Sequence, residues 1–348
     1  MENIEQTQLK GNQELLSKKF STNHIKSMQF LEFLYESLLC RHMNSEEQSR
    51  ITKDYLDYVS KIEKRQLVSQ MMKSDEFMRI YRSVILDKLI PHSQIVCIEK
   101  DGFEIFIDLR EIYIGWGILN SWYEAEEIAF VKSQIKSGMT FLDVGANIGY
   151  YTMTDAHLVG SEGLVIAIEP LLRSYHLLER SVLRNNFQDR VELWKKAASS
   201  EKSLVQLSYN TNTQNMGGAG IIENDISFSD SNSNVSIETV EAYTIDDIVQ
   251  NRAIDFVKMD IEGAEGLAIQ GADRLLSSRK ATLMIEFNES RLNSVSKITS
   301  SELISQIKKL DYKVFKLVNK TLQPIDEISL VLKELETKII NLIFIPNF

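Results

Sequence analysis

The stretch FLDVGANIGYYT, residues 141–152, constrains the fold of this chain more than any other. It begins with the end of a short apolar run, which is typical of a buried strand. A turn rich in glycine follows, and the spacing of apolar residues then becomes helical in YYTMTDAHLVG. A strand, a glycine turn and a helix in this order place backbone N–H groups and the positive end of a helix against a polar ligand.

The turn itself indicates what kind of ligand to expect. We expect Gly145 and Gly149 to let the backbone approach the ligand where a Cβ atom would collide. Asp143, at the carboxyl end of the strand, can receive an ammonium group or a bound water, and Asn147 lies between the glycines. The spacing G-x-x-x-G matches neither the dinucleotide fingerprint nor a P-loop, so neither NAD nor ATP is predicted.

A second acidic residue follows at a meaningful distance. Twenty residues after Gly149, the apolar run GLVIAIEP closes with Glu169. An acidic residue at the end of the second strand is placed to accept hydrogen bonds from the hydroxyls of a ribose. The pattern therefore predicts a nucleoside ligand.

D-x-G-x-N-x-G followed by a strand that ends in Glu-Pro resembles S-adenosylmethionine-dependent methyltransferases. Five later segments resemble the FkbM family: NMGGAG (215–220), TIDDI (244–248), DFVKMDIEGAEGLAIQGA (255–272), MIEF (284–287) and NLIFIP (341–346). The resemblance covers roughly residues 95–348. It implies an α/β fold, with a doubly wound, Rossmann-like class I methyltransferase sheet of seven strands whose last strand is antiparallel. It also implies S-adenosyl-L-methionine as the cofactor.

The resemblance assigns further site residues. Ala197 falls where the backbone usually touches the adenine edge. Asp260 and Glu286 end the strands beside the donor site, which makes them the candidate general bases for a hydroxyl acceptor. A divalent ion held by Asp260 and Glu262 is the alternative use of these carboxylates, and we assign no metal.

Two residues are expected on the substrate side. In the family the SWYE segment lies over the active site, so Glu124 is expected to face the substrate. Its other interpretation is a carboxylate at a helix N-terminus, where the helix dipole favours it. Asn215 lies in a predicted inserted hairpin, residues 203–243, and matches the substrate-side loop of the family. The neighbouring glycines, Gly217 and Gly218, fit a closing lid or a plain turn.

Composition excludes several other classes of protein. The chain has 348 residues, a formal net charge of −10 and no basic stripe, which disfavours nucleic acid as a partner. Its two cysteines, Cys40 and Cys97, are far apart, so neither a disulfide framework nor a zinc site is indicated. No signal-peptide layout and no apolar run of membrane-spanning length are present. We therefore expect a cytoplasmic protein.

The N-terminal part predicts a separate unit. We expect a flexible N-terminus over residues 1–22, a helical module over 23–90, and a methyltransferase domain with a preceding β-hairpin at Asp101-Gly102 over 91–348. Within the module, FLEFLYESLLCR (30–41) and SQMMKSDEFMRIY (69–81) resemble a small all-α domain of bacterial glycan-synthesis proteins. A plain helical bundle that packs against the enzyme is the alternative.

These features together predict an S-adenosylmethionine-dependent O-methyltransferase that methylates a sugar hydroxyl of a bacterial glycan or glycoconjugate. A glycan-synthesis protein is the expected partner of the helical module. The sugar follows from resemblance and not from the residues themselves. Two alternatives stay open: a methyltransferase of a small secondary metabolite or lipid, and a non-catalytic nucleotide-binding scaffold in a glycan assembly.

Overall fold

The computed structural model describes residues 95–347 except 110, 112, 211–219, 222–234 and 326. All of these belong to one compact unit, Gln94–Phe348. The predicted flexible N-terminus (1–22), the helical module (23–90) and Asn215 lie outside the described residues. Within the described part, no helix has the length and apolar character needed to cross a membrane.

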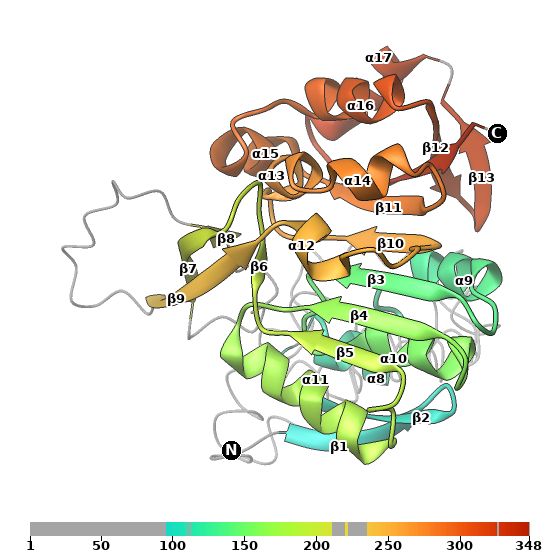
Figure 1. Cartoon of the computed structure of the whole chain (residues 1–348), viewed down its shortest axis with the longest axis vertical. Coiled ribbons are helices and arrows are strands. Elements are labelled where there is room, and N and C mark those ends of the chain that lie inside the picture. Colours follow the sequence, from blue (N-terminus) through green and yellow to red (C-terminus); the bar gives the residue numbers. More distant parts are fainter. Residues whose placement is uncertain are drawn as a thin grey trace, which may run out of the picture. The chain divides into compact units, whose positions relative to one another are not determined.

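An eight-stranded sheet forms the centre of this unit, in the order β13-β12-β14-β11-β10-β3-β4-β5 (Figure 1). Its strands are β3 (Thr140–Val144), β4 (Leu164–Ile168), β5 (Val191–Trp194), β10 (Phe256–Met259), β11 (Thr282–Phe287), β12 (Tyr312–Val318), β13 (Thr321–Pro324) and β14 (Ile340–Pro346). β3, β4, β5, β10 and β11 are parallel, and β14 is antiparallel to both β11 and β12. The predicted α/β class and the antiparallel last strand are therefore confirmed. The predicted count of seven strands is wrong, because β13 turns back on β12 as an additional edge strand.

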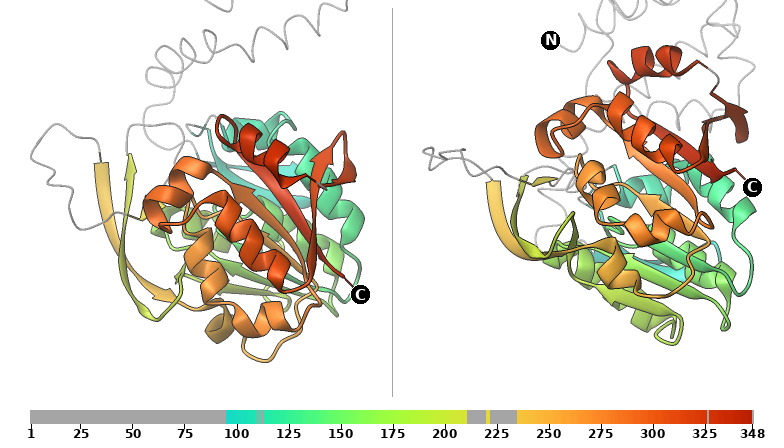
Figure 2. Two further views of the ribbon diagram at one scale, coloured as in Figure 1. Left: turned by 90° about the horizontal axis from the view of Figure 1, so that it is seen from above. Right: turned by 45° about the horizontal axis from the view of Figure 1, so that its top comes forward.

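Helices cover both faces of the sheet. One face carries α8 (Gly115–Leu119), α9 (Ala125–Gln134), α10 (Tyr150–Val159) and α11 (Leu172–Arg184). The other carries α12 (Ile245–Val249), α13 (Glu265–Gln270), α14 (Asp273–Ser277), α15 (Glu289–Val295), α16 (Ser300–Lys309) and α17 (Ile328–Leu335). Figure 2 shows the sheet between these two sets of helices.

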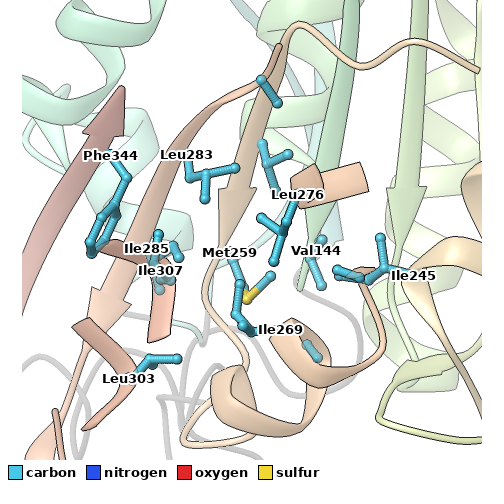
Figure 3. Packing of buried hydrophobic residues seen from close by; sticks show 14 of the residues in the cluster. Val144, Ile245, Met259, Ile269, Leu276, Leu283, Ile285, Leu303, Ile307 and Phe344 are labelled. Atoms are coloured by element: carbon cyan, nitrogen blue, oxygen red, sulfur yellow. The ribbon is translucent and has the colours of Figure 1, made fainter. Parts of the chain in front are cut away.

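Side chains alternate between the two faces along each strand. On β10, Val257 and Met259 join the core under α12–α17, which Figure 3 shows in part, whereas Phe256 joins the core under α8–α11. By the same alternation Lys258 shares the face of Phe256. Burial on both faces explains why the central strands are almost continuous apolar runs.

Two hairpins flank the sheet. β1 (Ile95–Lys100) pairs with β2 (Phe103–Asp108), and the turn residues Asp101 and Gly102 have φ of 54° and 91°, as the predicted Asp-Gly turn requires. β7 (Ser203–Asn210) pairs antiparallel with β9 (Val235–Tyr243), which confirms a hairpin in residues 203–243. β6 (Ala197–Ala198) and β8 (Gly220–Ile221) complete this second sheet.

The parallel register brings the carboxyl ends of the five parallel strands to one edge. β3 lies between β10 and β4, with Val144 opposite Met259 on one side and opposite Ile168 on the other. The chain order therefore reverses beside β3, as predicted, and the crevice above such a switch point is where ligands bind in open α/β sheets.

Candidate active site

A cavity lies at this switch point and encloses about 890 Å³ of empty space, part of it open to solvent. Its walls come from the turn after β3, the end of β4, β6, and the segment after β10. We call it the first cavity. Of the predicted cofactor-binding residues, Gly145, Asn147, Glu169 and Ala197 line it, and so does Asp260.

The two glycines of the turn are required by packing within the protein. Both have positive φ, 86° for Gly145 and 91° for Gly149. A Cβ atom at Gly145 would lie 1.9 Å from the carbonyl oxygen of Asp260, and one at Gly149 would lie 2.3 Å from Cδ1 of Leu178. A Cβ atom at Gly145 would thus collide with the end of β10, and one at Gly149 with α11, and the collision with a ligand stays a prediction. Gly149 is buried and does not line the cavity.

Asp143 lies beneath the first cavity and not in its wall. It is fully buried on β3, and the Thr152 hydroxyl donates to its Oδ2 at 2.6 Å. Its Oδ1 has no hydrogen-bond partner. Burial raises the pKa of Asp143, against the lowering effect of the Lys258 ammonium and the Thr152 hydroxyl.

Glu169 is held in a fixed orientation just past β4. The backbone N–H groups of Asn147 and Leu171 each donate to one of its carboxylate oxygens at 2.8 Å. Burial raises the pKa of Glu169 to about 7, although these two N–H groups oppose the rise. Each carboxylate oxygen can accept a further hydrogen bond, so Glu169 can still bind hydroxyl groups in the cavity.

A second cavity adjoins the first and shares five lining residues with it. The shared residues are Ile114, Tyr123, Asn147, Asp260 and Glu262. Glu124 and Glu286, two of the predicted catalytic and substrate residues, line the second cavity only. Asp260 therefore stands where the two cavities meet.

Glu124 is tied to the site by a short hydrogen bond. It precedes α9 with a left-handed backbone conformation, φ 41° and ψ 44°, and the Tyr151 hydroxyl donates to its Oε2 at 2.5 Å. Burial raises the pKa of Glu124, the Lys258 ammonium lowers it, and Asp260 raises it. The predicted placement toward a substrate cavity is thus compatible with its position at the start of a helix.

The carboxylates around Asp260 surround a single buried cation. Lys258 is 3% exposed, and its Nζ donates to Asp260 Oδ2 at 3.1 Å. Burial opposes the charge of Lys258, yet the nearby carboxylates, Asp260 first, raise its pKa. Burial, followed by the Asp260 and Glu124 charges, raises the pKa of Glu286 to about 10, even though Lys258 lowers it.

Sequence reasoning missed Lys258, Tyr123 and Tyr151 as site residues. Lys258 carried a signal: it interrupts FVKM, an otherwise apolar run of a central parallel strand, where an ionised side chain needs partners. The two tyrosines lie in segments that the sequence had marked, SWYE and the glycine-turn motif, but their own contacts depend on how α9 and α10 pack. Over the described part of the chain, no group of three or more His, Cys, Asp or Glu residues is arranged to hold a metal ion.

Residues 143–314 match the family described as the methyltransferase FkbM domain. This segment is a methyltransferase domain. Its cofactor is S-adenosylmethionine, and the matched residues contain Asp143, the glycine turn, Glu169, Ala197, Asp260 and Glu286.

Several solved structures are similar at low identity. A methyltransferase FkbM from Methylobacillus flagellatus is 18% identical over 68% of this chain and 55% of its own length, with a TM-score of 0.36. The chain thus spans about half the length of that protein. An S-adenosylmethionine-dependent O-methyltransferase from Thermotoga maritima is 14% identical, over 75% of this chain and 95% of that one, with a TM-score of 0.35. Fibrillarin from Aeropyrum pernix, bound to S-adenosyl-L-methionine, is 10% identical, over 72% of this chain and 81% of that one, with a TM-score of 0.37. Similarity at this level carries no information on the acceptor.

Proposed function

We propose that the chain transfers the methyl group of S-adenosylmethionine to a sugar hydroxyl of a bacterial glycan or glycoconjugate. The observation that carries this proposal is the position of Asp260, which lines both cavities. A methyl donor in the first cavity and an acceptor in the second would meet beside it. The donor supplies an already activated methyl group, so the protein's work is alignment and proton removal.

The first cavity fits the donor. Glu169 offers carboxylate oxygens where ribose hydroxyls are expected, and Ala197 leaves room beside the adenine. Gly145 and Asn147 form the turn that would face the rest of the donor. Beneath them, the unpartnered Oδ1 of Asp143 adds negative potential under a cationic ligand.

The second cavity supports a neutral, hydroxyl-bearing acceptor. Its lining contains six acidic residues and two lysines: Glu124, Glu127, Asp260, Glu262, Glu286, Glu334, Lys316 and Lys338. Carboxylates accept hydrogen bonds from hydroxyls and repel phosphates. At the rim, the exposed ring of Tyr113 packs edge-on against Trp122 and Tyr123, with centroids 5.8 and 5.9 Å away. Aromatic faces beside carboxylates suit the apolar face and the hydroxyls of a sugar ring.

Asp260 and Glu286 are the proposed groups that receive or orient the acceptor's proton. Glu124, tied to Tyr151, is the proposed acceptor-binding carboxylate, and Asn215 remains a proposed substrate residue on sequence grounds. We also propose residues 23–90 as a module that binds a glycan-synthesis protein. That proposal comes from the sequence resemblance alone.

The test is transfer from methyl-labelled S-adenosylmethionine to a panel of nucleotide sugars, oligosaccharides, amines, phenols and lipids. The proposal predicts labelled O-methyl sugar, identified by mass and by its O-methyl resonance. Label on an amine, a small metabolite or a lipid alone would replace the sugar by that acceptor. Donor binding without transfer to any member would favour the non-catalytic scaffold.

A further inference from the structure

Lys258 occupies a position where a charge is costly. It lies on the central strand β10, between β3 and β11, with Asp143 and Met284 directly opposite. Its side chain shares a sheet face with Phe256, which belongs to the apolar core under α8–α11. An ammonium group buried there without partners would cost many kcal/mol, so its retention requires compensating charges.

The groups that face Lys258 come from four other elements and from the segment that follows its own strand. Asp260, two residues further on, accepts a hydrogen bond from Nζ at 3.1 Å. Asp143 faces it from β3 and Glu286 from the end of β11. From the α9 side comes Glu124, and the ring of Tyr151 on α10 lies 5.0 Å from Nζ. The hydrogen bond to Asp260 and the ring of Tyr151 hold the ammonium next to the junction of the cavities, and the charges of the three other carboxylates favour its charged form.

We propose that Lys258 is the positioning residue that holds Asp260 as an oriented carboxylate, so that Asp260 and not Glu286 accepts the acceptor's proton. This inference rests on the proposed function. In the step, the acceptor O–H proton passes to an Asp260 oxygen while the O–H electron pair forms the bond to the methyl carbon. The electron pair of the S–C bond returns to sulfur.

The contrast with Glu286 follows from their contacts. Asp260 has the ammonium at hydrogen-bond distance, whereas no ion pair or hydrogen bond between described residues reaches the Glu286 carboxyl. Burial and the nearby charges of Asp260 and Glu124 favour the protonated form of Glu286. A protonated carboxyl donates a hydrogen bond and does not act as a base. In the proposed step Glu286 would therefore donate to an acceptor oxygen in the second cavity, and Asp260 would receive the proton.

The first measurement needs neither donor nor acceptor. In protein labelled with ¹³C at the aspartate carboxyls, the Asp260 resonance is assigned by its loss in Asp260→Asn. This resonance should move in Lys258→Met, because the variant removes the Nζ hydrogen bond to Asp260 Oδ2. Lys132→Met is the matched control, because Lys132 forms an ion pair with Asp101 at 2.8 Å and lines neither of the two cavities. It should leave the Asp260 signal unchanged.

The second measurement uses turnover with a confirmed acceptor. In Lys258→Met kcat should fall while the KM for the acceptor changes little, because Asp260 loses the hydrogen bond that orients it. Lys258→Arg, which keeps a charged donor at this position, should restore kcat toward that of the wild type.

An Asp260 signal that is the same in Lys258→Met and wild type overturns the inference, even if sugars are methylated. Conversely, a shifted signal with no hydroxyl methylation by the wild type refutes the proposed function and leaves the Lys258–Asp260 coupling standing. If Lys258→Met does not fold, Lys258→Met/Asp143→Asn is compared with Asp143→Asn, since that pair removes one buried charge of each sign. The Asp260 carboxyl signal is then compared between these two variants, and an unchanged signal overturns the inference.

Discussion

Glu169 connects donor affinity to pH in a way that can be calculated. Its pKa of about 7 means that about one-eleventh of the carboxyl is ionised at pH 6 and about ten-elevenths at pH 8. Ribose hydroxyls donate to the ionised form. Affinity should therefore fall as the pH falls through 7, by about tenfold between pH 8 and pH 6.

Replacing Glu169 by Gln removes this charge while keeping the size of the side chain. A hydrogen bond to a charged group contributes about 1.5–3 kcal/mol, so affinity at pH 8 should fall at least about tenfold. The change in donor affinity between pH 6 and pH 8 should become smaller as well. Calorimetry with S-adenosylhomocysteine measures both effects. Glu162→Gln is the control, because Glu162 is an exposed residue at the opposite end of β4. A folded Glu169→Gln protein with wild-type affinity and wild-type pH dependence would refute the assignment.

Three further predictions follow from the same geometry. Asp260→Asn should leave donor affinity nearly unchanged and lower kcat by about 10²–10⁴-fold in steady-state assays; full activity would transfer the role to Glu286. Gly145→Ala should lower the free energy of unfolding by clearly more than Gly138→Ala. At Gly138 the added Cβ atom meets no atom within 4 Å, so that variant costs only about 1–2 kcal/mol of backbone strain. Equal losses of unfolding free energy in denaturant titrations would contradict this. Burial, then the Asp143 charge, raises the pKa of Asp155 well above its usual value, and neither of its carboxyl oxygens has a partner. The folded state thus keeps a proton that the unfolded state releases above about pH 4, so stability falls as the pH rises. Asp155→Asn should raise the melting temperature at pH 7 by roughly 2–4 °C per kcal/mol recovered, with a smaller gain at pH 4.

Much of the architecture could be predicted because it depends on local signals. Apolar runs mark the buried strands, and an acidic residue marks the carboxyl end of three of them: Glu169 after β4, Asp260 after β10 and Glu286 near the end of β11. Parallel pairing then brings Glu169, Asp260 and Glu286 to one edge without further information. The Asp-Gly turn likewise specified the first hairpin through its positive φ values.

What sequence reasoning missed depends on contacts between distant elements. β13 is a short edge strand that alternates weakly, and it exists because it pairs with β12. Gly149 is needed because α11 packs against its Cα, which no local pattern reveals. The pairing of Lys258 with Asp260 is local in sequence, but its burial among Asp143, Glu124 and Glu286 depends on strand register and on the packing of α9 and α10.

The central claim is that the donor occupies the first cavity with its methyl group directed toward Asp260. A crystal structure with S-adenosylhomocysteine tests it most directly. We predict ribose hydroxyls within about 3 Å of the Glu169 carboxylate, at ordinary hydrogen-bond distance, and the sulfur atom facing the junction of the two cavities beside Asp260. A nucleoside bound elsewhere, or a sulfur atom directed away from Asp260, would contradict the account.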